Sequence, residues 1–251
     1  MHPEGVARAL LLAENALRVQ SREHPDGWGM AWYVGGVPTV VRSLEAAHED
    51  RSFDDVGESV ESQAVIAHVR KASVGGISLE NTHPFERGRW VFVHNGTIPD
   101  WDRAQPLLEA QLDPSLRREL RGETDSERCF ALFLTRLQLR CDPEAASFTD
   151  AVQALRETVA AVRAASEPGG AGPASTTFVL SDGRLLLGCS RGRTLHTSHP
   201  APGADGSVAW FAVSSEAPGV VAPEHPDPWE LLGEDRWCGV DGDLRLHHGA
   251  L

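Results

Sequence analysis

The sequence contains few cysteines and no long hydrophobic run. Only four of its 251 residues are cysteine, and no two of them form a Cys-x-x-Cys pair, which argues against a zinc knuckle or a redox motif. No apolar stretch approaches the roughly 20 residues that a membrane-spanning helix needs. The start shows neither the charged region nor the cleavage site of a signal peptide. We therefore expect a cytoplasmic protein with no membrane association.

Basic residues are also scarce. Lys and Arg number 23 against 36 Asp and Glu, which gives a net charge of −13. Nucleic acids and anionic lipids attract positive surfaces, so this balance argues against both as partners. The eleven histidines include no His-Glu-x-x-His pattern, and we assign no metal site and expect no cofactor. The length allows a single large domain, which we predict over residues 1–251.

The predicted elements begin with strands, continue with helices and return to strands. Hydrophobic spacing predicts helices over residues 5–19, 52–60, 101–111, 113–120, 124–140 and 148–165, with Asp100 as a candidate cap of the helix over 101–111. Alternation and turn signals predict strands over residues 28–34, 37–41, 64–69, 89–93, 176–181, 184–190 and 207–214, with a further hairpin over 237–247. Gly35-Gly36 and Asp182-Gly183 are each expected to form the two-residue turn of a hairpin. A Gly- and Pro-rich flexible loop is expected at about 166–174. Because the order is not a regular βαβα alternation, it favours an α+β fold of packed sheets with helices outside.

Two charged residues follow predicted element boundaries. Arg70 comes directly after a buried strand, where a guanidinium can hold a carboxylate through two parallel hydrogen bonds. An arginine at such a place is more commonly a solvated charge. Asp125 lies in the first turn of a helix whose capping box would be formed by Thr124 and Glu127. Its carboxylate suits the helix dipole and is left free to meet an ammonium group.

Glycine-containing segments also end or begin strands. Asn95 and Gly96 close the predicted strand 89–93, where a side-chain amide and a backbone N–H could point at one oxyanion. The same Asn-Gly pair is equally typical of a type I′ hairpin turn, and this segment alone leaves both readings open. The glycines of segment 24–29 would allow its backbone to approach another group closely. The alternative is an ordinary β-turn that leads into the following hairpin.

Taken together, these segments resemble a known family. Residues 24–29, 67–73, 81–85, 90–98 and 123–127, in this order and spacing, resemble the class II glutamine amidotransferases, most closely their stand-alone bacterial branch. The resemblance extends from about Leu11 to about Glu216. It implies the four-layer αββα sandwich of N-terminal-nucleophile hydrolases, in which two mainly antiparallel sheets are stacked between helices.

The resemblance also implies roles for individual residues. Arg70 would hold the α-carboxylate of glutamine and Asp125 its α-ammonium group. Asn95 and Gly96 would form the oxyanion hole for hydrolysis of the amide or of another γ-glutamyl bond. The other implied residues line the pocket or form part of its wall: His83, Ser73, Trp28 and Gly29. Any synthetase or ammonia acceptor would belong to another chain.

The family's nucleophile is a cysteine directly after the initiator methionine, and the sequence departs from this pattern. It reads Met1-His2-Pro3-Glu4-Gly5 and enters the predicted helix almost at once. One interpretation, which we favour, is that a Met-Cys start lies upstream. The alternative is a non-catalytic protein that binds a γ-glutamyl compound or acts as a regulator. Both predict that the chain as printed hydrolyses glutamine poorly or not at all.

Overall fold

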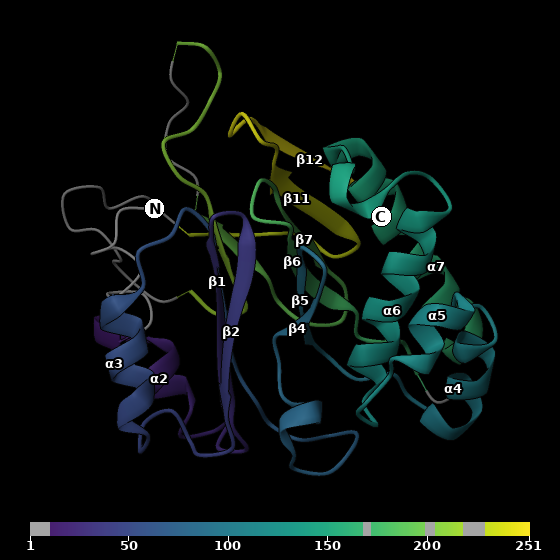
Figure 1. Cartoon of the computed structure of the whole chain (residues 1–251), viewed down its shortest axis with the longest axis horizontal. Coiled ribbons are helices and arrows are strands. Elements are labelled where there is room, and N and C mark those ends of the chain that lie inside the picture. The colour runs from purple at the N-terminus through teal and green to yellow at the C-terminus, as the bar shows by residue number, and fades with distance from the viewer. Residues whose placement is uncertain (1–10, 168–171, 199–203, 218–228) are drawn as a thin grey trace.

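The computed structural model describes residues 11–167, 172–198, 204–217 and 229–251. Figure 1 shows four layers, in which two stacked sheets are covered by helices on both outer faces. All strand pairs of the two stacked sheets are antiparallel. The predicted α+β sandwich of αββα type is therefore confirmed.

The first sheet has the strand order β2-β1-β3. Its strands are β1 (Trp28–Val34), β2 (Val37–Ser43) and β3 (Val65–Val69). Gly35 and Gly36 join β1 to β2 with φ angles of 58° and 80°, which are the positive values that a type I′ turn requires. The predicted Gly-Gly hairpin is thus confirmed.

The second sheet has the order β12-β11-β7-β6-β5-β4. Its strands, in chain order, are β4 (Phe85–Arg87), β5 (Trp90–Asn95), β6 (Thr177–Ser181), β7 (Leu186–Ser190), β11 (Arg236–Val240) and β12 (Leu246–Ala250). A small third sheet contains β8 (His196–Ser198), β9 (Ala212–Ser214) and β10 (Glu230–Leu231). The predicted C-terminal hairpin is therefore present as β11 and β12.

Helices cover each outer face (Figure 1). Beside the first sheet lie α2 (Leu17–Gln20) and α3 (Arg51–Ser59). Beside the second sheet lie α4 (Trp101–Glu109), α5 (Pro114–Arg118), α6 (Asp125–Gln138) and α7 (Phe148–Ser166). Two short 3₁₀ helices are η2 (Leu79–Asn81) and η3 (Pro143–Ala145). No helix in the described ranges is both long and apolar enough to cross a membrane.

Strand β5 shows why the layers stack. Side chains alternate along a strand, so Trp90 and Phe92 face one way and Val91 and Val93 the other. Phe92 packs in the large core beneath α6, stacked on Phe130 with ring centroids 5.3 Å apart. Val91 and Val93 belong to a smaller core shared with residues of the first sheet. One strand therefore binds the second sheet to the helices and to the first sheet.

Two predicted elements differ from the structure. The helix expected over 5–19 is interrupted in its described part: Leu11 and Leu12 are π-helical, Ala16 is extended (ψ 156°), and the α-helix α2 covers only Leu17–Gln20. The side-chain amide of Gln20 donates to the Asn15 carbonyl, which a continuous helix would pair with a backbone N–H. Residues 5–10 lie outside the described residues, as do 168–171 of the expected loop.

The strand expected over 207–214 is shorter than predicted. Only Ala212–Ser214 forms β9, and Ser207 makes a single bridge to Arg245. Residues 209–216 line the cavity described below, and most of them do not pair with a neighbouring strand. The hydrophobic alternation therefore predicted the element but not its length.

The helix caps are only partly as predicted. Thr124 caps α6 by accepting from the Glu127 N–H, but the Glu127 carboxylate does not close the expected box. It accepts instead from the backbone N–H groups of Arg121 and Gly122, each at 2.9 Å. Asp100 precedes α4 in a left-handed conformation and caps no N–H with its side chain. Glu127 therefore anchors the turn that leads into α6.

Candidate active site

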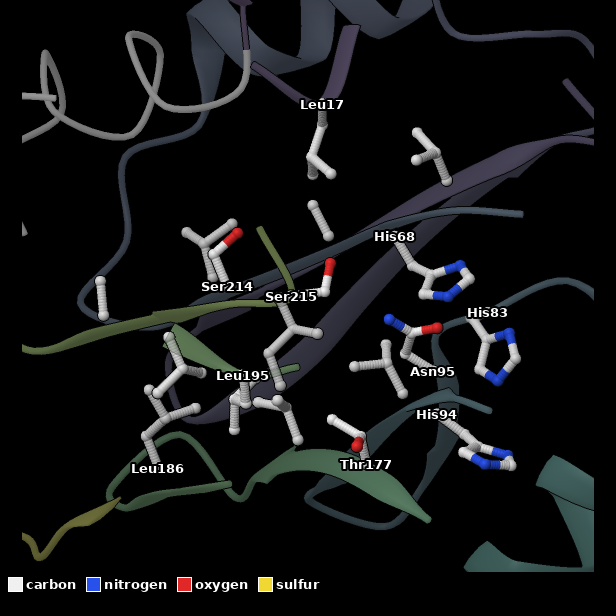
Figure 2. Close-up of a pocket in the computed structure, with 18 of the residues that line it drawn as sticks. Leu17, His68, His83, His94, Asn95, Thr177, Leu186, Leu195, Ser214 and Ser215 are labelled. Atoms are coloured by element: carbon white, nitrogen blue, oxygen red, sulfur yellow. The ribbon is translucent and has the colours of Figure 1, made fainter. Parts of the chain in front are cut away.

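A cavity of about 1200 Å³ lies between the two stacked sheets (Figure 2). It is bordered by residues of β3, the end of β5, β6, β9 and the start of α6. Six of the eight site residues predicted from the sequence line it: Arg70, Ser73, His83, Asn95, Gly96 and Asp125. The fold therefore brings together segments that are far apart in the chain.

Trp28 and Gly29 do not line this cavity, contrary to the predicted wall role. Trp28 is fully buried on the opposite side of β1, edge-on to Phe53 at 5.0 Å, and its indole N–H donates to Asp50 at 2.9 Å. Gly29 packs against the backbone of His83, since a Cβ there would lie 2.1 Å from the His83 carbonyl oxygen. The glycine permits a close approach, but it supports a site segment instead of touching a ligand.

The turn before β1 holds the end of β3 in place. The Arg70 N–H donates to the Gly27 carbonyl at 2.8 Å, and the Asp26 N–H donates to the Arg70 carbonyl at 3.0 Å. The Asp26 carboxylate accepts from the Ala72 N–H at 2.8 Å. Gly27 has a φ of 113°, which glycine adopts at little cost. These bonds fix the backbone from which Arg70 extends.

Arg70 is buried but incompletely paired. It is 3% exposed, and its Nη2 donates to the carbonyls of Val74, Gly75 and Gly76 at 3.2–3.4 Å. Its Nη1 is buried and has no hydrogen-bond partner in the described part of the chain. Burial lowers the pKa of the guanidinium. A buried cation with a free N–H group gains most from a bound anion, which a carboxylate can supply.

Asp125 connects the start of α6 to the loop after β5. One carboxylate oxygen accepts from the Ile98 N–H at 2.8 Å, and the other accepts from the Ser126 N–H at 2.8 Å. The residue is 2% exposed and borders the cavity. Each carboxylate oxygen can accept more than one hydrogen bond, so acceptor capacity remains for a cationic ligand group.

Asn95 and Gly96 do not form a hairpin turn. Strand β5 pairs with β4, which precedes it, and with β6, which begins only at Thr177. A Cβ on Gly96 would lie 2.3 Å from the Ser175 carbonyl oxygen, so only glycine fits there. The turn interpretation of Asn-Gly is therefore wrong, and the pair ends a strand at the cavity.

His94 is a site residue that the sequence reasoning missed. Its Nε2 lies 2.8 Å from the Ser175 carbonyl, which can only accept, so Nε2 carries the proton. Its Nδ1 then accepts from the Ser126 hydroxyl at 2.9 Å. Burial lowers the pKa of this imidazole. The neutral ring holds the end of β5 against α6. The only sequence signal for a role of His94 was that it is a polar residue in an apolar strand, next to Asn95.

His68 was also missed and lies against His83. Their ring centroids are 4.4 Å apart, and Figure 2 shows both rings at one end of the cavity with Asn95. Burial lowers the pKa of His68 to about 3 and that of His83 well below its usual value. Nδ1 of His68 and both ring nitrogens of His83 lack partners among the described residues. The pair is a neutral wall with capacity to hydrogen-bond a ligand.

No described cysteine borders the cavity. Cys129, Cys189 and Cys238 are buried elsewhere, and burial raises the pKa of each thiol. Cys141 is half-buried beyond the end of α6, and burial raises its pKa as well. The described residues thus place a buried cation, a buried anion and the Asn95–Gly96 strand end around the cavity, but no activated thiol.

Comparison with known proteins defines the class. Residues 11–205 match the family model of the class II glutamine amidotransferases. A Saccharomyces cerevisiae "Probable glutamine amidotransferase DUG3" is 31% identical over 140 residues, covering 52% of this chain and 39% of that protein. The "Gamma-glutamyl-hercynylcysteine sulfoxide hydrolase" of Mycobacterium tuberculosis CDC 1551 is 34% identical over 125 residues, covering 44% of this chain and 52% of the relative.

A solved structure supports the fold. The class II glutamine aminotransferase domain protein from Silicibacter pomeroyi superposes with a TM-score of 0.62 at 22% identity, covering 90% of this chain and 91% of that one. The alignments with these two curated relatives cover only 39% and 52% of the relatives' own length. The chain belongs to the class II glutamine amidotransferase family.

Proposed function

We propose that the cavity binds glutamine or another γ-glutamyl compound, and that the complete enzyme hydrolyses its amide or γ-glutamyl bond. The observation that carries this proposal is the joint placement of Arg70, Asp125 and the Asn95–Gly96 strand end around one cavity. A buried cation with a free Nη1 suits the α-carboxylate, and a buried carboxylate suits the α-ammonium group. This charge arrangement matches the zwitterion at one end of a γ-glutamyl ligand.

The proposed reaction proceeds through a thioester. A thiolate attacks the γ-carbonyl carbon, and the side-chain amide of Asn95 and the Gly96 N–H stabilise the oxyanion. Loss of one such donor raises the barrier by about 3–4 kcal/mol. Collapse breaks the C–N bond, and the leaving amine takes the proton that the general base removed from the thiol. Water then hydrolyses the thioester.

In this proposal the thiol comes from a segment outside the described residues. The cavity is bordered by consecutive residues of β3 and by consecutive residues 209–216. Since side chains alternate along a strand, consecutive lining residues indicate that strand edges border the cavity. β3 pairs only with β1 among the described strands. An inserted strand would satisfy these edges and lead its end toward Asn95.

Ligand binding tests the clamp without requiring catalysis. Glutamine titrated calorimetrically into the wild type should bind more tightly than into Arg70→Ala by about 1–3 kcal/mol, because a charge-assisted hydrogen bond is lost. Arg51→Ala is a matched control that should leave the affinity unchanged, since Arg51 is exposed on α3 and does not border the cavity. Equal affinity of wild type and Arg70→Ala would remove the carboxylate role.

Activity requires a chain that carries the thiol. The coding DNA upstream of Met1 should contain an in-frame start followed by a cysteine codon, and the extended chain should release glutamate from glutamine or a γ-glutamyl compound. Its Cys→Ala variant should not. If the extended chain is as inactive as this variant on glutamine and on several γ-glutamyl compounds, the enzyme proposal is wrong.

A non-catalytic γ-glutamyl-binding protein is the second candidate function. The observation that favours it is that no described cysteine borders the cavity. It predicts glutamine binding that depends on Arg70, together with a stop codon in place of an upstream Met-Cys start. The four free thiols suit a reducing compartment, so a cytoplasmic location belongs to either proposal.

A further inference from the structure

Asn81 hydrogen-bonds to the segment that follows Arg70 and to the segment that precedes Asp125, but it does not line the cavity. It ends η2 and is 3% exposed, so its side-chain amide is almost completely removed from water. We infer that Asn81 is a positioning residue that sets the distance between Arg70 and Asp125, and thereby selects ligands carrying both an α-carboxylate and an α-ammonium group. This inference rests on the proposed function and deepens it.

The nitrogen end of Asn81 holds the loop that supports Arg70. Its Nδ2 donates to the Gly76 carbonyl at 3.0 Å, and the same carbonyl accepts from Nη2 of Arg70 at 3.2 Å. The loop passes close to the amide, since a Cβ on Gly75 would lie 2.9 Å from Nδ2 of Asn81. Asn81 therefore fixes one of the carbonyls that orient the guanidinium.

The oxygen end of Asn81 holds the segment that leads into Asp125. Its Oδ1 accepts from the Glu123 N–H at 2.7 Å, two residues before Asp125. A Cβ on Gly122 would lie 2.4 Å from this oxygen, so the backbone approaches as closely as a glycine allows. The Glu123 carboxylate accepts from the Gly76 N–H at 3.5 Å, which adds a second link between the two segments.

A single buried amide thus bridges the segment of the cation and the segment of the anion. A buried amide whose donor and acceptor are both paired has few alternative positions, because leaving either unpaired is costly. A shift of Asn81 would change the separation of the two charges without removing either one. Its effect on affinity should therefore depend on which charged groups the ligand has.

The test compares three ligands by calorimetry. Glutamine has both charged groups, glutaramic acid lacks the ammonium group, and 4-aminobutanamide lacks the carboxylate. Asn81→Asp keeps an acceptor for Glu123 but replaces the donor to Gly76 with an oxygen. We expect its Kd to rise about tenfold for glutamine and for glutaramic acid, but less than about twofold for 4-aminobutanamide.

Two further variants separate positioning from general destabilisation. Thr82→Val removes a hydrogen bond to Ser78 within the same segment and should change no Kd by more than about twofold. Asn81→Ser removes both amide contacts. If Asn81→Asp does not fold, Asn81→Ser should weaken glutamine binding, in free energy, by about the sum of its effects on the two truncated ligands.

The outcomes are distinct. Equal weakening of all three ligands by the Asn81 variants, or no weakening, would overturn the positioning role while glutamine binding by the wild type still supports the proposed function. No binding of glutamine by the wild type would overturn both. Ligand-dependent weakening at Asn81, with Thr82→Val near the wild type, supports the inference.

Discussion

Three histidines that border the cavity are kept neutral by the fold. His68 lies in β3, His83 follows η2, and His94 lies in β5. Burial is the main cause of the lowered pKa of each imidazole. Neutral imidazoles can accept as well as donate hydrogen bonds, whereas imidazolium only donates. Their protonation would also place positive charge next to Arg70. Keeping them neutral therefore preserves Arg70 as the main cation of the site.

The lowered histidine pKa values predict acid sensitivity. Below about pH 6.5 the histidines of the unfolded chain bind protons, whereas those of the native chain do not. The contribution of these histidines to the free energy of unfolding is therefore fully present above that pH. It is lost as the pH falls toward the folded pKa, which is about 3 for His68. Each such histidine contributes a slope of up to about 1.4 kcal/mol per pH unit. Urea unfolding at pH 7.0, 6.0 and 5.0 measures it.

The control for this prediction is a variant in which a residue that cannot titrate replaces His68. His68→Asn should unfold with a smaller loss of stability between pH 6.5 and 5.0 than the wild type, whatever its stability at pH 7. Identical pH slopes in the two proteins would show that His68 is protonated equally in both states.

At the scale of elements, the turn between β6 and β7 is fixed by a buried side chain. The sequence predicted a two-residue hairpin turn at Asp182 and Gly183, but β6 ends at Ser181 and β7 begins at Leu186. The fully buried Asp182 carboxylate accepts from the N–H groups of Arg184 and Leu185 at 2.9 and 3.0 Å, and Arg184 also pairs with it at 2.6 Å. This side chain replaces the backbone pairing that a two-residue turn would make.

Removal of the Asp182 carboxylate should be strongly destabilising. Asp182→Ala leaves backbone N–H groups unpaired at a buried turn, and we expect a loss of about 2–4 kcal/mol in the free energy of unfolding. Asp205 makes a similar local bond, to the Ser207 N–H at 3.1 Å, but is exposed. Asp205→Ala should cost less than about 0.5 kcal/mol, because water can replace the lost acceptor. Similar losses in the two variants would contradict this account.

At the scale of the whole molecule, stability should follow the layers. Phe92→Ala empties the core between the second sheet and the helices, where we expect a loss of about 3–5 kcal/mol. Val91→Ala affects the smaller core between the sheets and should cost about 2 kcal/mol. Denaturant unfolding of both variants measures the difference, and a larger loss at Val91 would contradict the layer assignment.

Much of the architecture followed from local patterns. Alternation and a Gly-Gly turn predicted the β1–β2 hairpin, and helical spacing with a threonine cap predicted α6. The helix predicted over 5–19 is interrupted at Ala16, and the Gln20 side-chain amide donates to the Asn15 carbonyl that a continuous helix would pair with a backbone N–H. Apolar spacing cannot detect such a competition, since it records which residues are buried but not what their backbones pair with.

The sequence by itself determined the order of the elements, the family resemblance and the candidate residues for the proposed zwitterion and oxyanion contacts. Only the tertiary structure decided which of those residues share a cavity. It places Arg70, Asp125 and Asn95 around one cavity and buries Trp28 in a core away from it. It also shows that His94 and Asn81 hydrogen-bond to the segments that carry these residues. The reason is physical: periodicity encodes the face on which a side chain lies, whereas its neighbours depend on long-range packing and on where buried polar atoms find partners.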